Sequence, residues 1–498
     1  MNFKRQLFLG HRWLGVALSV LFVAWFFSGV VMVYVGFPAT DHERRIAAQS
    51  PLIESLPERA MGPALAPRSR LRVFKGQWYR TADDGWFAVT DGRRLQAVDA
   101  TSARTVVQAA LQRWGEDARI KALEAIRNDQ WTVAQRYDVH RPLWRVKLDD
   151  GRWLHVSSRT GEIVLETTGA ERGWNWVGSV IHWLYFTPIR ERPRLWSELV
   201  IWLSVLGTGL ALTGLWGGLR QLRVGRSRRG RSPVPYRGAA RWHHWTGLVF
   251  GVFVVTFIVS GLLSMTPWGL FSRDGVSADE RLALEGAPPA LSVAQVRDAL
   301  VAFDVHEPAF VAREAETVAI DDRWWLRLRD GADQRLIELA TGAVGERLPD
   351  TVIEAAADRL SAGRVVRDRA WLRSPDLYYY DHRNGVSLPV LRLRLEDGNA
   401  PWYYLDPRTG RIAQRPDATA RAYRWWFNAL HSLDFPWLIY FRPAWDIVVI
   451  ALSLGGLALS ATGVVVGWRR LRTALSRRAR DRQGSVPEKR AAIRQERS

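Results

Sequence analysis

Four long stretches without a charged residue constrain this 498-residue chain more than any other feature. A helix rises about 1.5 Å per residue, so about 20 apolar residues cross the hydrocarbon core of a bilayer. Each stretch is about that long or longer, which excludes an ordinary water-soluble fold and predicts four transmembrane helices. The stretches are Trp13–Thr40, Leu199–Leu219, Trp242–Ser272 and Ile447–Trp468.

The net charge of +20 is concentrated beside these stretches. Segment 220–241 contains eight arginines and no acidic residue, and segment 469–498 is also rich in arginine. Basic residues at alternate ends of successive spans follow the positive-inside rule, which predicts that both termini and segment 220–241 are cytoplasmic. The two long connections then face outward. Because the charge lies beside the spans, we expect a lipid bilayer as the partner and no nucleic acid.

The chain repeats itself. His11-Arg12-Trp13-Leu14-Gly15 returns 232 residues later as His243-His244-Trp245-Thr246-Gly247. A second set of residues returns 249 residues later. At the offset of 232, Ser28-Gly29 also returns as Ser260-Gly261. At the offset of 249, Thr160-Gly161 returns as Thr409-Gly410, His182 as His431, Trp196 as Trp445, and Thr213-Gly214 as Thr462-Gly463. The pattern predicts a tandem duplication of span, outer domain, outer-surface helix and span.

The outer segments mix helical periodicity with short alternating runs, a pattern typical of α+β modules. We predict a helix over Ser102–Trp114 and strands over Trp131–Ala134, Leu143–Leu148 and Trp153–Ser157. The predicted fold class is an α-helical membrane protein with four transmembrane helices and two outer α+β domains. The expected divisions are 1–36 (span), 37–172 (domain), 173–190 (outer-surface helix), 195–219 (span), 220–241 (basic loop), 242–266 (span), 267–422 (domain), 423–439 (outer-surface helix), 443–468 (span) and 469–498 (basic tail).

Four of the ten histidines are related by the repeat. His11 and His243 lie at the cytoplasmic ends of the first and third spans, whereas His182 and His431 lie just outside the second and fourth. One such histidine alone would be read as an interfacial residue that reaches water. Two at each membrane face match what two b-type haems require, because a neutral imidazole is a good axial ligand of haem iron.

Several neighbouring residues bear on this prediction. His244 is the alternative to His243, although the register of the repeat favours His243. Small residues such as Gly15 and Gly247 would open a slot for a porphyrin, and Arg12 and Arg241 are candidate partners of its propionates. The chain has no cysteine, which excludes iron–sulfur clusters and covalently attached c-type haem. It also lacks a glycine-rich dinucleotide motif, so the expected electron donor is quinol or a cytoplasmic reductase.

The HRWLG opening, the Ser-Gly pairs, the Thr-Gly turns between strands and the four-span duplication resemble the PepSY-associated transmembrane helix family over residues 5–472. Some members of that family look like inner-membrane di-haem reductases of ferric siderophores. The resemblance therefore implies PepSY-like periplasmic domains, haem iron bound at His11, His243, His182 and His431, and a location in the bacterial inner membrane. It also implies that the chain is an enzyme, a haem-dependent oxidoreductase that reduces a ferric siderophore or another ferric chelate.

A second constellation precedes a strand in each outer segment. Tyrosine, aspartate, histidine and arginine side chains could bind a ferric chelate or pass an electron outward, but a hydrogen-bonded turn leading into a strand is the favoured interpretation. The residues concerned are Tyr137, His140, Arg141, Tyr380, Asp381, His382 and Arg383. The histidines outside the repeat, His42, His155 and His306, are expected to be ordinary surface residues.

Two other classes of function are compatible with parts of the sequence. The outer modules could bind a peptide or partner protein at a sheet edge, with the spans as anchors and no redox activity. A transporter is disfavoured, because the repeats enter the membrane in parallel and the spans contain no internal carboxylate or lysine to couple ions.

Overall fold

The computed structural model describes residues 3–58, 63–82, 85–222, 234–273, 275–381, 385–396 and 401–495. The chain forms two compact units. A helical unit comprises Met1–Gly36, Trp174–Leu270 and Trp425–Ser498, and a sheet-bearing unit comprises Phe37–Gly173 and Phe271–Arg424. Each unit thus combines segments from both halves of the sequence.

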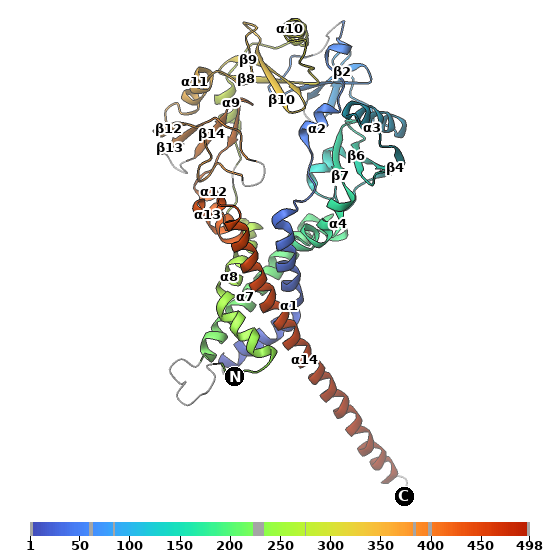
Figure 1. The fold of residues 1–498 in the computed structure, drawn as a ribbon, viewed down its shortest axis with the longest axis vertical. Coiled ribbons are helices and arrows are strands. Elements are labelled where there is room, and N and C mark those ends of the chain that lie inside the picture. The colour runs from blue at the N-terminus through green and yellow to red at the C-terminus, as the bar shows by residue number, and fades with distance from the viewer. Residues whose placement is uncertain are drawn as a thin grey trace. The chain divides into compact units, whose positions relative to one another are not determined.

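The helical unit is built on four long helices, one for each predicted stretch. They are α1 (Phe3–Tyr34), α7 (Pro193–Gln221), α8 (Ala239–Ser264) and α14 (Ala444–Gln495). All four are long and apolar enough to cross a membrane, so the chain is a membrane protein. Helices α1 and α8 each pack against both α7 and α14, which closes a four-helix bundle (Figure 1). Buried Phe22, Phe26, Phe257 and Ile258 lie in its core.

Short helices precede α7 and α14. The predicted single helix over 173–190 is wrong: the chain forms α4 (Gly169–Val177), α5 (Ser179–His182) and α6 (Thr187–Arg190). The second predicted helix, 423–439, is likewise divided into a π-helix (Arg424–Ala429) and α13 (Pro436–Ile439). Leu184 and Leu433 adopt left-handed backbone angles two residues after His182 and His431, and a left-handed residue ends a right-handed helix.

Two four-stranded antiparallel sheets confirm most of the predicted strands. The first contains β4 (Ile120–Ile126), β5 (Leu143–Leu148), β6 (Trp153–Ser157) and β7 (Ile163–Thr167), and α3 (Ala100–Trp114) packs against it. The second contains β12 (Val366–Leu372), β13 (Val390–Leu395), β14 (Trp402–Asp406) and β15 (Arg411–Gln414), with α9 (Ala278–Glu285) and α11 (Asp350–Leu360) against it. The predicted strand Trp131–Ala134 is wrong. The Asp129 carboxylate accepts hydrogen bonds from the amides of Trp131 and Thr132, which makes a turn.

A seven-stranded antiparallel sheet joins the two outer segments, in the order β11-β10-β9-β8-β1-β2-β3. Strands β1 and β8 pair with Leu71 opposite Ala315, and α10 packs on the sheet. This sheet combines strands from 37–172 and 267–422, the ranges of the two predicted domains. The division of the chain into two separate domains over these ranges stays a prediction. Its elements are β1 (Arg70–Phe74), β2 (Gln77–Ala82), β3 (Gly85–Ala88), β8 (Glu314–Ile320), β9 (Arg323–Asp330), β10 (Asp333–Glu338), β11 (Val344–Gly345) and α10 (Val293–His306).

Buried charges cross the β1–β8 junction. Arg70 contacts Glu162 at 2.5 Å and Glu314 at 2.6 Å, and Arg45 contacts the same two carboxylates at 2.6 and 3.0 Å. Desolvation alone would raise the pKa of the fully buried Glu314, but Arg70, Arg45 and Arg329 hold that pKa well below its usual value. The carboxylate therefore stays charged at neutral pH and ties strands of both outer segments together.

His155 is not a surface residue, contrary to the prediction from its lack of a partner in the repeat. Its side chain is fully buried, and its Nε2 lies 2.8 Å from the Asp129 carboxylate. The residue 249 positions later is Tyr404, whose hydroxyl donates to the Asp376 carboxylate at 3.0 Å. In each of the two sheets a buried ring thus contacts a half-buried aspartate, through histidine in one sheet and tyrosine in the other.

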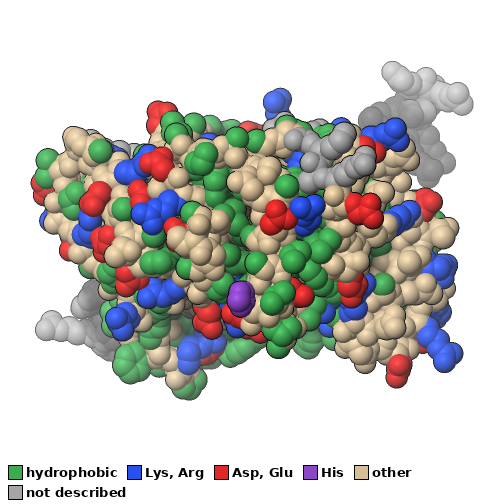
Figure 2. All heavy atoms as spheres, turned by 90° about the horizontal axis from the view of Figure 1, so that it is seen from above, with side chains coloured by type: hydrophobic (Ala, Val, Ile, Leu, Met, Phe, Trp, Pro, Cys, Tyr) green, Lys and Arg blue, Asp and Glu red, His purple; other side chains and the backbone are tan. Residues whose placement is uncertain are grey.

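The surface seen from above in Figure 2 carries interspersed basic and acidic side chains. Among the described residues visible there, no large patch of one sign stands out. The single-sign basic face typical of nucleic-acid-binding proteins is therefore not a feature of this surface.

Candidate functional site

The four histidines related by the repeat meet in two facing pairs inside the helical unit. The ring centres of His11 on α1 and His243 on α8 are 6.3 Å apart. The ring centres of His182 at the end of α5 and His431 are 6.2 Å apart. Each pair combines one histidine from the first half of the chain with one from the second.

Every one of these imidazoles is held by the same local device on a neighbouring helix. The Nδ1 atom of His11 lies 3.1 Å from the carbonyl oxygen of Leu210 on α7. A carbonyl in a helix is normally screened by the side chains three and four residues later. Here these residues are Thr213 and Gly214, and the missing Cβ of Gly214 leaves room for the ring, because a Cβ there would lie 2.6 Å from His11 Cε1. We call such a carbonyl with its following Ser/Thr-Gly pair a histidine seat.

The other three seats repeat this arrangement. His243 Nδ1 lies 3.1 Å from the Leu459 carbonyl oxygen, and Thr462 and Gly463 follow on α14. The His243 Nδ1 also lies 3.4 Å from the Thr462 hydroxyl, and the two seats of the second pair have closer hydroxyl contacts. His182 Nδ1 lies 3.1 Å from Trp25 O and 3.1 Å from Ser28 Oγ beside Gly29, and His431 Nδ1 lies 3.2 Å from Phe257 O and 3.1 Å from Ser260 Oγ beside Gly261.

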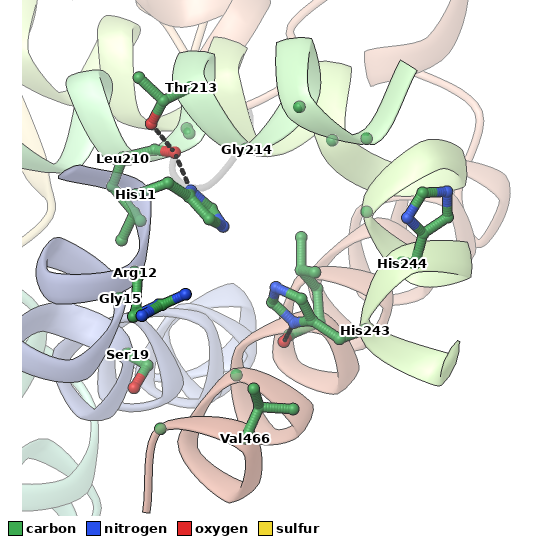
Figure 3. Close-up of a pocket in the computed structure, with 18 of the residues that line it drawn as sticks. His11, Arg12, Gly15, Ser19, Leu210, Thr213, Gly214, His243, His244 and Val466 are labelled. Atoms are coloured by element: carbon green, nitrogen blue, oxygen red, sulfur yellow. Dashed lines mark hydrogen bonds between the residues drawn. The ribbon is translucent and has the colours of Figure 1, made fainter. Parts of the chain in front are cut away.

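The seats determine the tautomer of each ring. A backbone carbonyl can only accept a hydrogen bond, so the Nδ1 atom that contacts it carries the proton. The neutral ring then has its lone pair on Nε2, the nitrogen that is free to bind a metal. A bond from Nδ1–H to a carbonyl is also the usual second-shell support of a metal-binding histidine. Figure 3 shows the His11 and His243 rings turned toward the same cavity.

The spacing of the rings fits one metal ion between each pair. A metal–imidazole bond is about 2 Å long, so two imidazoles that bind from opposite sides place their ring centres roughly 6 Å apart. In the described part of the chain, no three His, Cys, Asp or Glu side chains come close enough to form a metal site of their own. A metal held by two histidines here would need its other ligands from a non-protein group, such as the four nitrogens of a porphyrin.

A cavity of about 470 Å³ adjoins His11 and His243 between the four long helices. This volume lies within the usual range of cofactor pockets, about 300–1,000 Å³. Eight glycines line the cavity, including the predicted Gly15 and Gly247, so the helices leave a slot without side chains across part of it. Arg12 and Arg470 also line it, whereas Arg241 is not among the lining residues. Arg12 and Arg470 are therefore the candidate partners of an anionic group here.

His243 and His244 are clearly distinguished by the fold. His243 faces His11 and occupies the seat on α14, as the register of the repeat indicates. The His244 ring lies apart from this pair in Figure 3, 5.3 Å from the ring of Tyr236. It is a lining residue of the cavity, but it is not opposed to His11.

Comparison with known proteins agrees with this architecture. The profile of the PepSY-associated TM region matches residues 240–488, half of the chain. The chain belongs to the PepSY-associated transmembrane family. The matched half contains His243, His431 and the seats on α8 and α14. No curated protein and no solved structure matches the chain.

Two tryptophans support His182 and His431 of this PepSY-associated protein. The Trp196 indole N–H donates to the Trp183 carbonyl at 2.8 Å, and Trp183 directly follows His182. The Trp445 indole N–H donates to the Ser432 carbonyl at 3.0 Å, and Ser432 directly follows His431. Each histidine-bearing turn is thus attached to the start of the next long helix.

The tyrosine–histidine–arginine constellation is part of the sheet-bearing unit. Tyr137 is buried, and Arg141 pairs with Asp138 and donates to the Thr132 carbonyl at 2.6 Å. These contacts are those of a turn that precedes a strand, the favoured interpretation. Tyr380 lies beneath the Arg424 guanidinium at 5.0 Å and Asp381 is exposed, while His382 and Arg383 lie outside the described residues. A substrate role for this set stays a prediction.

Proposed function

We propose that this PepSY-associated protein is a di-haem b-type oxidoreductase of the bacterial inner membrane. In this proposal it passes electrons across the membrane and reduces a periplasmic ferric complex, with a ferric siderophore as the expected substrate. The observation that carries the proposal is the separation of about 6 Å between the rings of both histidine pairs. Four unprotonated Nε2 atoms, supported in the same way, are the donor set that two haem irons need.

The two pairs divide the membrane crossing. Ser28, which contacts His182, lies 17 residues after His11 on the same helix. That separation is about 25 Å along the helix axis, most of the thickness of the hydrocarbon core. Haem held by two imidazoles exchanges single electrons. With one histidine pair near each face, the helical bundle would hold two haems away from water, and a seat would fix the orientation of each imidazole ring.

The direction of transfer follows from the topology that the charges support. The sequence has arginines next to the helix ends that hold His11 and His243, and Arg12 and Arg470 line the cavity there, which supports a cytoplasmic position for that pair. The sheet-bearing unit would then be periplasmic and would contain PepSY-like domains. Electrons would enter from quinol or a cytoplasmic reductase. Reduction releases iron from oxygen chelators, because these hard ligands hold Fe(II) much less tightly than Fe(III).

The geometry also supports the proposed tandem duplication. The seats at Leu210 and Leu459 are 249 residues apart, and the seats at Trp25 and Phe257 are 232 residues apart. Both offsets equal those found in the sequence motifs. A duplicated unit that carries one histidine for each site explains why each pair spans the two halves.

An optical experiment tests the proposal. The detergent-solubilised protein, expressed with ample haem supply, should show a Soret band and sharp b-type bands on reduction, with two haems per chain. The reduced protein should then be reoxidised under anaerobic conditions by a ferric hydroxamate or catecholate, and not by the gallium(III) complex of the same ligand, which cannot be reduced under these conditions. A protein that stays colourless would refute the proposal and favour a membrane-anchored peptide- or partner-binding module without redox activity.

A further inference from the structure

Arg190 is a buried cation that lacks hydrogen-bond partners for part of its guanidinium group. The residue ends α6, and its side chain is only 7% exposed. The guanidinium stacks over the rings of Tyr185 and Trp196 at 4.9 and 4.6 Å. Its Nε and Nη1 atoms are buried without a hydrogen-bond partner. Because a charged donor removed from water without an acceptor is costly, this position calls for an anion that the described residues do not supply.

The cation belongs to the turn that carries an outward histidine. Trp196, on which Arg190 stacks, donates its indole N–H to the carbonyl of Trp183, the residue after His182. The ring of Tyr185, the other stacking partner, lies 5.2 Å from the ring of Trp183. Two successive side-chain contacts therefore link Arg190 to Trp183, the residue that follows His182.

A second arginine–tryptophan stack lies at the start of α14, and its arginine is paired with a carboxylate of the chain. Arg442 stacks over Trp445 at 4.7 Å, as Arg190 does over Trp196. The Arg442 Nε donates to Asp446 at 2.6 Å, and Asp446 directly follows Trp445. The residue that follows Trp196 is Ser197. The Arg442 side chain is 45% exposed and is paired with a carboxylate, whereas Arg190 is 7% exposed and no ion pair to it is seen among the described residues.

We propose that Arg190 is the anion-binding residue of the outward histidine pair and that it takes a carboxylate of the porphyrin bound there. This inference rests on the proposed function. A b-type haem carries two propionates, and a guanidinium binds a carboxylate through paired, charge-assisted hydrogen bonds. A lipid phosphate has similar oxyanion chemistry. The burial of Arg190 and its link to the His182 turn favour the porphyrin.

The test compares haem b with its dimethyl ester, in which both carboxylates are blocked. Each is titrated into the apoprotein in neutral detergent, in a His11→Ala background so that only the outward site binds. The parent should bind haem at least about tenfold more tightly than the ester. Arg190→Gln should bind haem about tenfold more weakly, should no longer distinguish it from the ester, and should lower the midpoint potential of the bound haem. Arg442→Gln, the matched control, should keep the preference of the parent.

Ser197→Asp provides a second variant that leaves Arg190 in place. It supplies the carboxylate that Asp446 supplies in the other half, so the preference for haem over the ester should disappear, whereas Ser197→Asn should retain it. An unchanged preference in both Arg190→Gln and Ser197→Asp would overturn the inference. The inference would also fail if Arg190→Gln left haem binding unchanged and abolished only the extra stability of the protein in phosphatidylglycerol over phosphatidylcholine vesicles, because the bound anion would then be an anionic lipid headgroup. Failure of the unmutated protein to bind any haem would instead refute the proposed function, and the inference with it.

Discussion

Gly214→Ala is the substitution that most directly tests the histidine seats. A Cβ at this position would lie 2.6 Å from His11 Cε1 and 3.1 Å from His11 Nδ1. Carbon atoms in ordinary contact are about 3.5–4.0 Å apart, so the ring would have to retreat by about 1 Å. Metal sites hold their ligand distances within about 0.2 Å, so this displacement should remove His11 as a ligand. We expect the haem content to fall from two to about one per chain.

The assay is the haem-to-protein ratio of the purified protein, together with the amplitude of the reduced b-type bands. Gly209→Ala is the matched control, because it adds the same methyl group to the same helix where no atom lies within 4 Å. Gly29→Ala should also keep both haems, since its Cβ would lie 3.5 Å from His182 Cε1, an ordinary contact. If Gly214→Ala retained two haems with an unchanged spectrum, the reasoning that the seat of His11 requires glycine would be wrong.

Three further predictions address the ligands and the sheet-bearing unit. His243→Ala should lose about one haem per chain and His244→Ala should lose none, as measured by the same haem-to-protein ratio. The stability contributed by Glu314 should be fully present at neutral pH and should be lost as the pH falls below about 4.5, because the pKa of Glu314 is depressed in the folded state. Glu314→Gln should destabilise the protein by about 3–5 kcal/mol at pH 7, and its thermal unfolding should depend less on acid pH than that of the parent. His155→Ala should cost about 3 kcal/mol in denaturant unfolding, since it opens a cavity and removes the 2.8 Å contact of His155 Nε2 with the Asp129 carboxylate, whereas exposed His306→Ala should cost almost nothing.

The spans and the pairing of the histidines could be predicted because the membrane makes strong demands on sequence. A helix that crosses a bilayer needs a long uncharged run, and its cytoplasmic end collects arginines. The repeat then indicated which histidines are equivalent, and it selected His243 over His244. The ring positions agree with that choice.

Other features had weak or no local signals. The acceptors of the seats are main-chain carbonyls, which every residue has, so only the recurring Ser/Thr-Gly pairs marked their places. The pairing of β1 with β8 joins residues about 240 positions apart, and an alternating strand pattern does not reveal its neighbour. The burial of His155 has no local signal in the sequence, because its partner, Asp129, lies on another segment 26 residues away. The left-handed Leu184 that divides the outer-surface helix is also unmarked, since leucine rarely adopts that conformation.

The shared sheet determines how the chain must be assembled. Strand β8 completes a sheet begun by β1, and each histidine pair likewise takes one ring from each half. Either half produced alone would expose an unpaired strand edge and would offer a single imidazole at each site. Cutting the chain between α7 and α8 should therefore yield two fragments that are inert separately and that regain their function only by recombining.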